Sequence, residues 1–187
     1  LTVRLRGMPG SSGSFSLSGW LTDIAGAAGF LHGQDRVNAV WLVGFGTGGA
    51  LSIVAAAQDQ RIRGVASIAA PADFLNWSRE PERLLERGRD GGAIGDGEPK
   101  DWEAWAAPLR TLSAVKSAAE LAPRPLLLLH GSQDEVVPPF DARAIADAHG
   151  TADLRIVEGA GHHLRHDPRA VALLLGWLDR QRRQEPL

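Results

Sequence analysis

The sequence contains no cysteine and no tyrosine among its 187 residues. The missing cysteine excludes disulfides, thiolate metal sites and a cysteine nucleophile, and the missing tyrosine excludes acid–base chemistry by a phenol. Neither sign of charge dominates, because the formal net charge is −2, so nothing favours nucleic acid or an anionic membrane as a partner. The hydrophobic share of 44% and the charged share of 22% are ordinary for one globular domain with a hydrophobic core.

One stretch, residues 39–57, is long and uncharged enough to be considered as a membrane span. Four glycines interrupt its middle, and they are Gly44, Gly46, Gly48 and Gly49. An apolar strand, a glycine turn and a buried helix therefore explain this stretch better than a span does. No basic segment or cleavage site of a secretion signal opens the sequence. We expect a cytoplasmic protein.

Short apolar runs alternate with helical patterns along most of the chain. The runs expected to form strands are 2–6, 40–43, 65–69, 126–130 and 154–157. Helical patterns cover 18–31, 48–58, 140–148 and the stretch that begins at Pro168, where Asp167 is the expected N-cap. Strands that alternate with helices form βαβ crossovers and a mainly parallel sheet, so the sequence predicts the α/β fold class.

Residues 72–124 interrupt this alternation, since they are rich in Arg, Glu, Gly and Pro and too long for a simple loop. We interpret this segment as an inserted, mostly helical cap over the carboxyl ends of the strands, where ligands of α/β proteins bind. The chain is thereby divided into core residues 1–71, cap residues 72–124 and core residues 125–187. Two roles are open for the tryptophans of the cap, lining a pocket or anchoring the cap by packing. They are Trp77, Trp102 and Trp105.

Residues 40–49, VWLVGFGTGG, form an expected strand, a tight turn and the start of a helix. This pattern resembles the nucleophile elbow G-x-S-x-G of α/β-hydrolases, with Gly46 where serine belongs. We expect Gly44, Gly48 and Gly49 to let strand and helix pass closely. The elbow holds its central residue in an unfavourable backbone conformation that costs a residue with a side chain about 1–3 kcal/mol. Glycine avoids that cost but carries no hydroxyl group.

The same glycines also match G-x-G-x-x-G, the fingerprint of dinucleotide-binding domains. That site requires an acidic residue about 20 positions further on, at the end of the next strand. Here the first acidic residue after that strand is Asp73, and a complete strand–helix unit precedes the glycines. A nucleotide site is therefore the weaker interpretation, and the sequence predicts no cofactor.

Two later motifs offer an acid and a base. Residues 126–138, LLLLHGSQDEVVP, resemble the acid-bearing loop H-G-x-x-D-x-x-V-P of α/β-hydrolases and present Asp134. Residues 154–163, LRIVEGAGHH, resemble the segment ahead of the last helix in that family and present His162. The order elbow, acid, base is the order that this fold uses. The resemblance to the α/β-hydrolase family covers essentially the whole chain.

The resemblance implies roles for these residues. In an intact triad serine attacks a carbonyl, histidine takes its proton, and aspartate orients and stabilises the imidazole. Asp134 and His162 would be the acid and the base, and Thr47 would offer its backbone N–H to an oxyanion of a small-molecule substrate. Without a hydroxyl at Gly46 no acyl-enzyme can form, and losing a triad nucleophile costs about 10⁶-fold in kcat. The Thr47 hydroxyl is not expected to substitute, because the elbow presents only its central residue.

Asp134 and His162 also have simpler interpretations. Asp134 could be an ordinary turn aspartate and His162 a solvated loop histidine. Glu135 is a poorer partner for the imidazole, and His163 is expected to point elsewhere. His162 and His166 are four positions apart and would share a metal only within a helix, but both precede the last helix. We therefore predict no metal site.

The sequence leaves three functions open. The leading one is a hydrolase-fold protein whose hydrolysis of esters or amides is weak or absent. If hydrolysis persists, His162 and Asp134 would activate a water in the space of the serine side chain. The second is a non-catalytic module that binds a small ligand or a partner. The third is an active serine hydrolase in which glycine has been introduced at Gly46 by engineering.

The N-terminal end also departs from the family pattern. α/β-Hydrolases normally have three strands before the one expected at 2–6, and a loop among them supplies the other oxyanion N–H. We therefore hypothesise that residues precede Leu1 in the intact protein.

Overall fold

The structure, a computed structural model, describes residues 1–184. By their internal contacts the residues form two compact units. Unit 1 combines Leu1–Val40 with Asp73–Ser113, and unit 2 combines Trp41–Ala72 with the chain from Ala114 onward. Each unit is described separately below.

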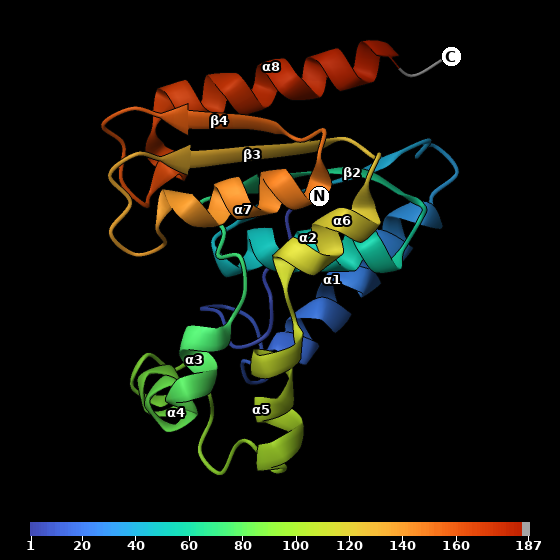
Figure 1. The fold of residues 1–187 in the computed structure, drawn as a ribbon. Coiled ribbons are helices and arrows are strands. Elements are labelled where there is room, and N and C mark those ends of the chain that lie inside the picture. Colours follow the sequence, from blue (N-terminus) through green and yellow to red (C-terminus); the bar gives the residue numbers. More distant parts are fainter. Residues whose placement is uncertain (185–187) are drawn as a thin grey trace. The chain divides into compact units, whose positions relative to one another are not determined.

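Unit 2 is built on a four-stranded sheet in the order β1-β2-β3-β4 (Figure 1). The strands are β1 (Val40–Phe45), β2 (Ile62–Ile68), β3 (Leu126–Gly131) and β4 (Asp153–Val157). β3 runs parallel to both of its neighbours, with Val65 opposite Leu126 on one side and Leu127 opposite Asp153 on the other. Four of the five expected strands are thus confirmed, and so is the α/β class.

Helices follow the strands of unit 2 in alternation. They are α2 (Thr47–Gln58), α6 (Ala114–Leu121), α7 (Pro139–His149) and α8 (Pro168–Gln184), with a 3₁₀ turn at Leu164–His166. Residues 39–57 therefore contain a strand, a turn and a helix, as the glycines indicate. Among the described helices none is both long and apolar enough to cross a membrane.

Both faces of the sheet are covered, which explains the unbroken leucine run of β3. Side chains alternate between the two faces of a strand, and Leu127 and Leu129 share a buried cluster with Trp177 of α8. Leu126 and Leu128 point to the opposite face and are equally buried. Figure 1 shows α7 and α8 on opposite sides of β3. A strand covered on both faces is apolar at every position rather than at alternate ones.

The start of α8 agrees with the expected cap. Asp167 Oδ1 accepts the N–H of Arg169 at 2.8 Å, and Pro168 is the first helical residue. The side-chain hydrogen bond from the Arg169 guanidinium lowers the pKa of Asp167 to about 2.

Unit 1 is helical in its described residues. Its helices are α1 (Leu17–His32), α3 (Leu75–Arg79), α4 (Pro81–Asp90) and α5 (Trp102–Thr111). Ser16 caps α1 through the N–H of Gly19 at 3.0 Å, and Asp101 caps α5 through the N–H of Ala104 at 3.0 Å. The boundary between the units falls at Ser113, so the predicted cap segment 72–124 is shared between them, with α6 in unit 2.

The strand expected at 2–6 is wrong. A strand needs a neighbouring strand to pair its backbone groups, and these residues join no sheet in the described chain. Instead Arg6 donates from its backbone N–H and its guanidinium to the carboxylate of Asp23 on α1, with the closest pair at 2.6 Å.

Candidate active site

The turn between β1 and α2 has the geometry that only glycine adopts without strain. Gly46 has φ 54° and ψ −127°, in the region that disfavours L side chains. Its N–H donates to the carbonyl of Ile68 at 2.8 Å, and its carbonyl accepts the N–H of Gly49 at 2.9 Å. A Cβ atom at position 46 would lie 3.9 Å from His162 Nε2. A side chain at this position would therefore start beside the imidazole.

The strand and the helix touch at Gly44 and Gly49. A Cβ on Gly44 would lie 2.3 Å from the carbonyl oxygen of Gly48, and one on Gly49 would lie 2.8 Å from Ser67 Oγ. We expected the missing side chain of Gly48 to let strand and helix pass closely. This expectation is wrong, because a Cβ at Gly48 would meet nothing within 4 Å. Gly48 contributes its carbonyl to the crossing, and its missing side chain plays no part.

Asp134 lies in the loop after β3 with its side chain fully buried. Its Oδ1 accepts the backbone N–H groups of Val136 and Val137, each at 2.9 Å. Its Oδ2 lies 2.9 Å from His162 Nδ1. The turn-aspartate interpretation therefore describes one oxygen of this carboxylate, while the other faces the imidazole.

The environment of Asp134 favours its ionised form. Burial by itself raises the pKa of the carboxyl, but the hydrogen bonds from the Val137 N–H, the His162 side chain and the Val136 N–H outweigh burial. The pKa of Asp134 therefore lies below its ordinary value. An ionised carboxylate accepts only, so His162 Nδ1 carries the hydrogen of this bond, and in the neutral ring Nε2 is the acceptor on the side of Gly46.

The two loops that bear the acid and the base are bonded to each other. The N–H of Gln133 donates to the carbonyl of Ala160 at 2.9 Å, and the N–H of Gly159 donates to Ser132 Oγ at 2.9 Å. A Cβ on Gly131 would lie 2.3 Å from the Ala160 oxygen, so the close approach needs glycine at that position. The separation of Asp134 from its imidazole partner is thus held by the backbone.

Thr47 is the first residue of α2 and directly follows Gly46. Backbone N–H groups in the first turn of a helix have no acceptor within the helix and carry its positive end. The start of α2 therefore offers N–H donors beside position 46, where an oxyanion would be stabilised.

The remaining predicted residues lie outside this arrangement. Glu135 is exposed, and His166 Nε2 accepts a hydrogen bond from Arg165 at 2.9 Å. The rings of His162 and His163 meet edge to face, with centroids 5.7 Å apart. Within residues 1–184 no group of three or more His, Cys, Asp or Glu side chains is placed to hold a metal ion.

Sequence reasoning missed His130, which is 1% exposed at the end of β3. Its Nε2 lies 2.9 Å from the carbonyl oxygen of Val137 and 3.3 Å from Asp134 Oδ2. The available signal was a histidine inside an otherwise apolar strand, four positions before the acid.

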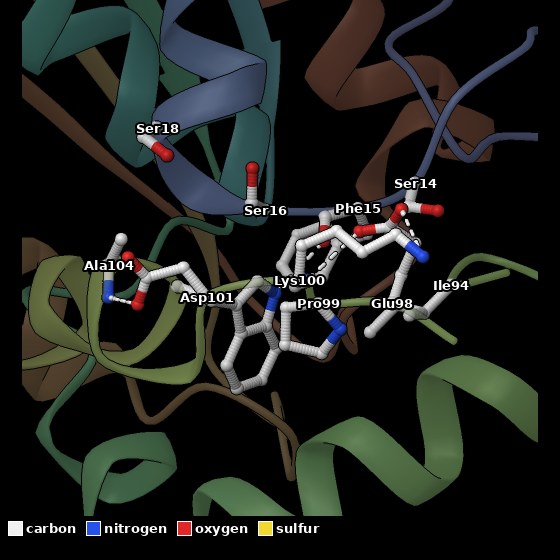
Figure 2. A pocket seen from close by; sticks show the side chains of 11 residues that line it. Ser14, Phe15, Ser16, Ser18, Ile94, Glu98, Pro99, Lys100, Asp101 and Ala104 are labelled. Atoms are coloured by element: carbon white, nitrogen blue, oxygen red, sulfur yellow. Dashed lines mark hydrogen bonds and ion pairs between the residues drawn. The ribbon is translucent and has the colours of Figure 1, made fainter. Parts of the chain in front are cut away.

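A hollow of about 190 Å³ lies in unit 1, between the start of α1 and the start of α5 (Figure 2). Phe15 and Trp105 line it, together with Glu98 and Lys100. Trp105 also donates from Nε1 to the carbonyl of Phe15 at 3.0 Å, so this tryptophan both lines a hollow and anchors a helix.

The other two tryptophans of this segment are packed against aromatic neighbours. Trp77 lies 5.5 Å from Phe74 between ring centroids, and Trp102 stacks on Trp105 at 5.4 Å. Neither lines this hollow.

Comparisons with known proteins agree with this fold. Residues 1–173 match the model of the alpha/beta hydrolase family. The chain therefore belongs to the alpha/beta hydrolase family. No curated protein sequence matches it.

Solved structures with the same fold include several hydrolases. The structure of Est1E from Butyrivibrio proteoclasticus with bound ferulic acid has a TM-score of 0.74 at 21% identity, over 96% of this chain and 74% of that one. The alpha/beta hydrolase GrgF from Penicillium sp. sh18 has a TM-score of 0.70 at 19% identity, over 94% and 76% of the two chains. A variant of the meta-cleavage product hydrolase CumD from Pseudomonas fluorescens IP01, in complex with acetates, has a TM-score of 0.63 at 20% identity, over 95% and 78%.

Proposed function

We propose that this chain is a hydrolase of carboxylic esters or amides whose activity is weak because Gly46 leaves the nucleophile position without a side chain. One observation carries the proposal. His162 Nδ1 lies 2.9 Å from Asp134, and a Cβ at position 46 would lie 3.9 Å from Nε2 of the same ring. An acid–base pair thus faces a position that has no side chain to act as a nucleophile.

The reaction open to this pair is direct attack by water. His162 Nε2 accepts a proton from a water molecule as the water oxygen bonds to the substrate carbonyl carbon. Asp134 stabilises the imidazolium that forms, and the N–H of Thr47 stabilises the oxyanion. The imidazolium then returns the proton to the leaving alkoxide or amine. General-base assistance contributes about 10²–10⁴-fold, far less than the roughly 10⁶-fold that a triad nucleophile supplies.

The test is hydrolysis of p-nitrophenyl esters by the chain, by Gly46→Ser and by His162→Ala, with His163→Ala as the matched control. We expect slow turnover that His162→Ala abolishes and His163→Ala retains. Gly46→Ser should raise the rate by several orders of magnitude, because a serine Oγ is one bond beyond a Cβ that would lie 3.9 Å from His162 Nε2. Turnover that is equal in the chain and in His162→Ala would contradict the proposed mechanism.

Aromatic acid esters are a rational first extension of that panel, since one protein of the same fold has been solved with ferulic acid.

We also propose that the chain binds a small-molecule ligand, that residues 72–124 act as a cap, and that the protein is cytoplasmic. The helices α3 to α5, which lie within that segment, support the cap.

The second candidate is a binding module without catalysis. It is favoured by the positive φ of Gly46, since glycine is the unstrained residue once a nucleophile is no longer required. This candidate predicts no His162-dependent turnover in the chain and none in Gly46→Ser. Turnover confined to Gly46→Ser would instead indicate an intact site whose serine has been replaced.

A further inference from the structure

We propose that His130 is a positioning residue for the acid–base pair, which holds the loop of Asp134 against His162 through the carbonyl of Val137. The proposal rests on the proposed function only in taking Asp134 and His162 as the pair that works on the substrate. His130 itself takes no part in the reaction proposed for that pair.

The hydrogen-bond partner of His130 determines where its proton lies. The carbonyl oxygen of Val137 can only accept a hydrogen bond, and it lies 2.9 Å from His130 Nε2. Nε2 must therefore carry a hydrogen and donate it. The ring is 1% exposed and is therefore shielded from bulk solvent.

Val137 is bound from two sides by this arrangement. Its N–H donates to Asp134 Oδ1 at 2.9 Å, and its carbonyl accepts from His130 at 2.9 Å. The strand β3, which bears His130, thus fixes the far end of the turn that closes around the carboxylate. Without this bond Val137 keeps its hydrogen bond to Asp134 but loses its own bond to β3.

His130 also approaches the carboxylate directly. Its Nε2 lies 3.3 Å from Asp134 Oδ2, the oxygen that accepts from His162 Nδ1 at 2.9 Å. A carboxylate held in place orients the imidazole of His162, so the hydrogen bond between Asp134 and His162 depends on His130 through the Asp134 loop.

The chain offers a matched control in His149. This ring is 4% exposed, and its Nε2 lies 2.9 Å from the carbonyl oxygen of Arg124. The partners of His149 are Arg124 and Thr151, which do not contact the acid–base pair. Both histidines make a buried ring-to-carbonyl hydrogen bond, but only His130 is joined to Asp134.

The experiment is NMR observation of the His162 Nδ1–H resonance at one fixed pH in the full chain and in His130→Asn, His130→Gln and His149→Asn. The side-chain nitrogen of glutamine can reach the place of Nε2, and that of asparagine cannot. We expect His130→Asn to broaden the His162 Nδ1–H resonance and shift it upfield, because the hydrogen bond to Asp134 is no longer held at one length. His130→Gln should restore the resonance, and His149→Asn should leave it unchanged. A resonance in His130→Asn equal to that of the unaltered chain overturns the proposal, as does equal broadening in His130→Gln.

A second measurement needs no variant. Nitrogen-15 shifts of the unaltered chain should show His130 protonated on Nε2, and a tautomer protonated on Nδ1 alone overturns the proposal even if the variants do not fold. Neither measurement uses turnover. An inactive chain in which His130→Asn still broadens the His162 resonance would refute the proposed hydrolysis and leave the role of His130 in place.

Discussion

At the scale of single residues, a side chain at position 46 affects the stability of the fold and the rate of hydrolysis in different ways. The backbone at Gly46 has φ 54°, and L side chains rarely adopt that conformation. A serine at this position places a nucleophile beside His162 but strains the backbone. The same substitution is therefore expected to have opposite effects on rate and on folding.

We predict that Gly46→Ser lowers the free energy of unfolding by about 1–3 kcal/mol, measured by urea unfolding monitored through tryptophan fluorescence. Gly48→Ser is the matched control, because a Cβ there would meet nothing within 4 Å and its φ is not positive. Equal stability of Gly46→Ser and the unaltered chain would show that the turn adjusts to a side chain.

Single residues differ in how far a sequence pattern predicts their contacts. Asp134 and His162 could be named in advance because each follows a strand and occupies a recognisable loop. His130 could not, because a lone histidine in an apolar strand does not reveal which groups it contacts. The close approach expected at Gly48 was likewise wrong, since the spacing of glycines does not show which of them faces the neighbouring strand.

At the scale of elements, one side chain joins α2, β2 and the start of β3. The guanidinium of Arg124 donates to three backbone carbonyls at the end of α2 and the start of β2, those of Ala56 at 2.7 Å, Ile62 at 2.8 Å and Asp59 at 3.0 Å. Burial lowers the pKa of Arg124 from its ordinary value. Its fork of donors satisfies carbonyls that the helix leaves without partners.

We predict that Arg124→Met lowers the free energy of unfolding by at least about 2 kcal/mol, because partly buried carbonyls lose their donors. Arg61→Met is the control, since Arg61 forms an exposed ion pair with Asp59 and little change is expected. Chemical denaturation of the two variants side by side measures the difference. Similar losses in both would mean that charge, rather than the three hydrogen bonds, is what Arg124 contributes.

The elements themselves were largely predictable from the sequence. The apolar run of β3 and the glycine turn after β1 specify their own structure, because a parallel strand buried on both faces is apolar throughout. The segment 2–6 was also expected to be a strand and forms none, since strand formation depends on a neighbour that the local sequence does not describe.

At the scale of the whole molecule, burial of titratable groups makes the folding of the chain depend on pH. Burial lowers the pKa of His149, and the hydrogen bond to the Arg124 carbonyl only partly offsets it. The unfolded chain therefore binds this proton more readily than the folded chain. Stability from His149 is present above its ordinary pKa of 6.5 and is lost as pH falls through the lower folded value.

We predict that the free energy of unfolding falls as pH is lowered from 8 to 5, and that His149→Gln flattens this dependence. A further loss is expected in more acid solution, because the pKa of Asp134 also lies below its ordinary value of 3.8. Urea unfolding at closely spaced pH values measures both steps. A chain whose stability does not change between pH 8 and 5 would contradict the role assigned to His149.

The sequence by itself determined the α/β class and the order of most elements, and it suggested the three positions that we propose as acid, base and missing nucleophile. These properties follow from local apolar patterns and short motifs, which depend on neighbours along the chain. Only the tertiary structure decided that Nε2 of His162 faces position 46 and that His130 holds the Asp134 loop through Val137. Such contacts join residues from different strands and loops, so they are set by packing between elements rather than by local sequence.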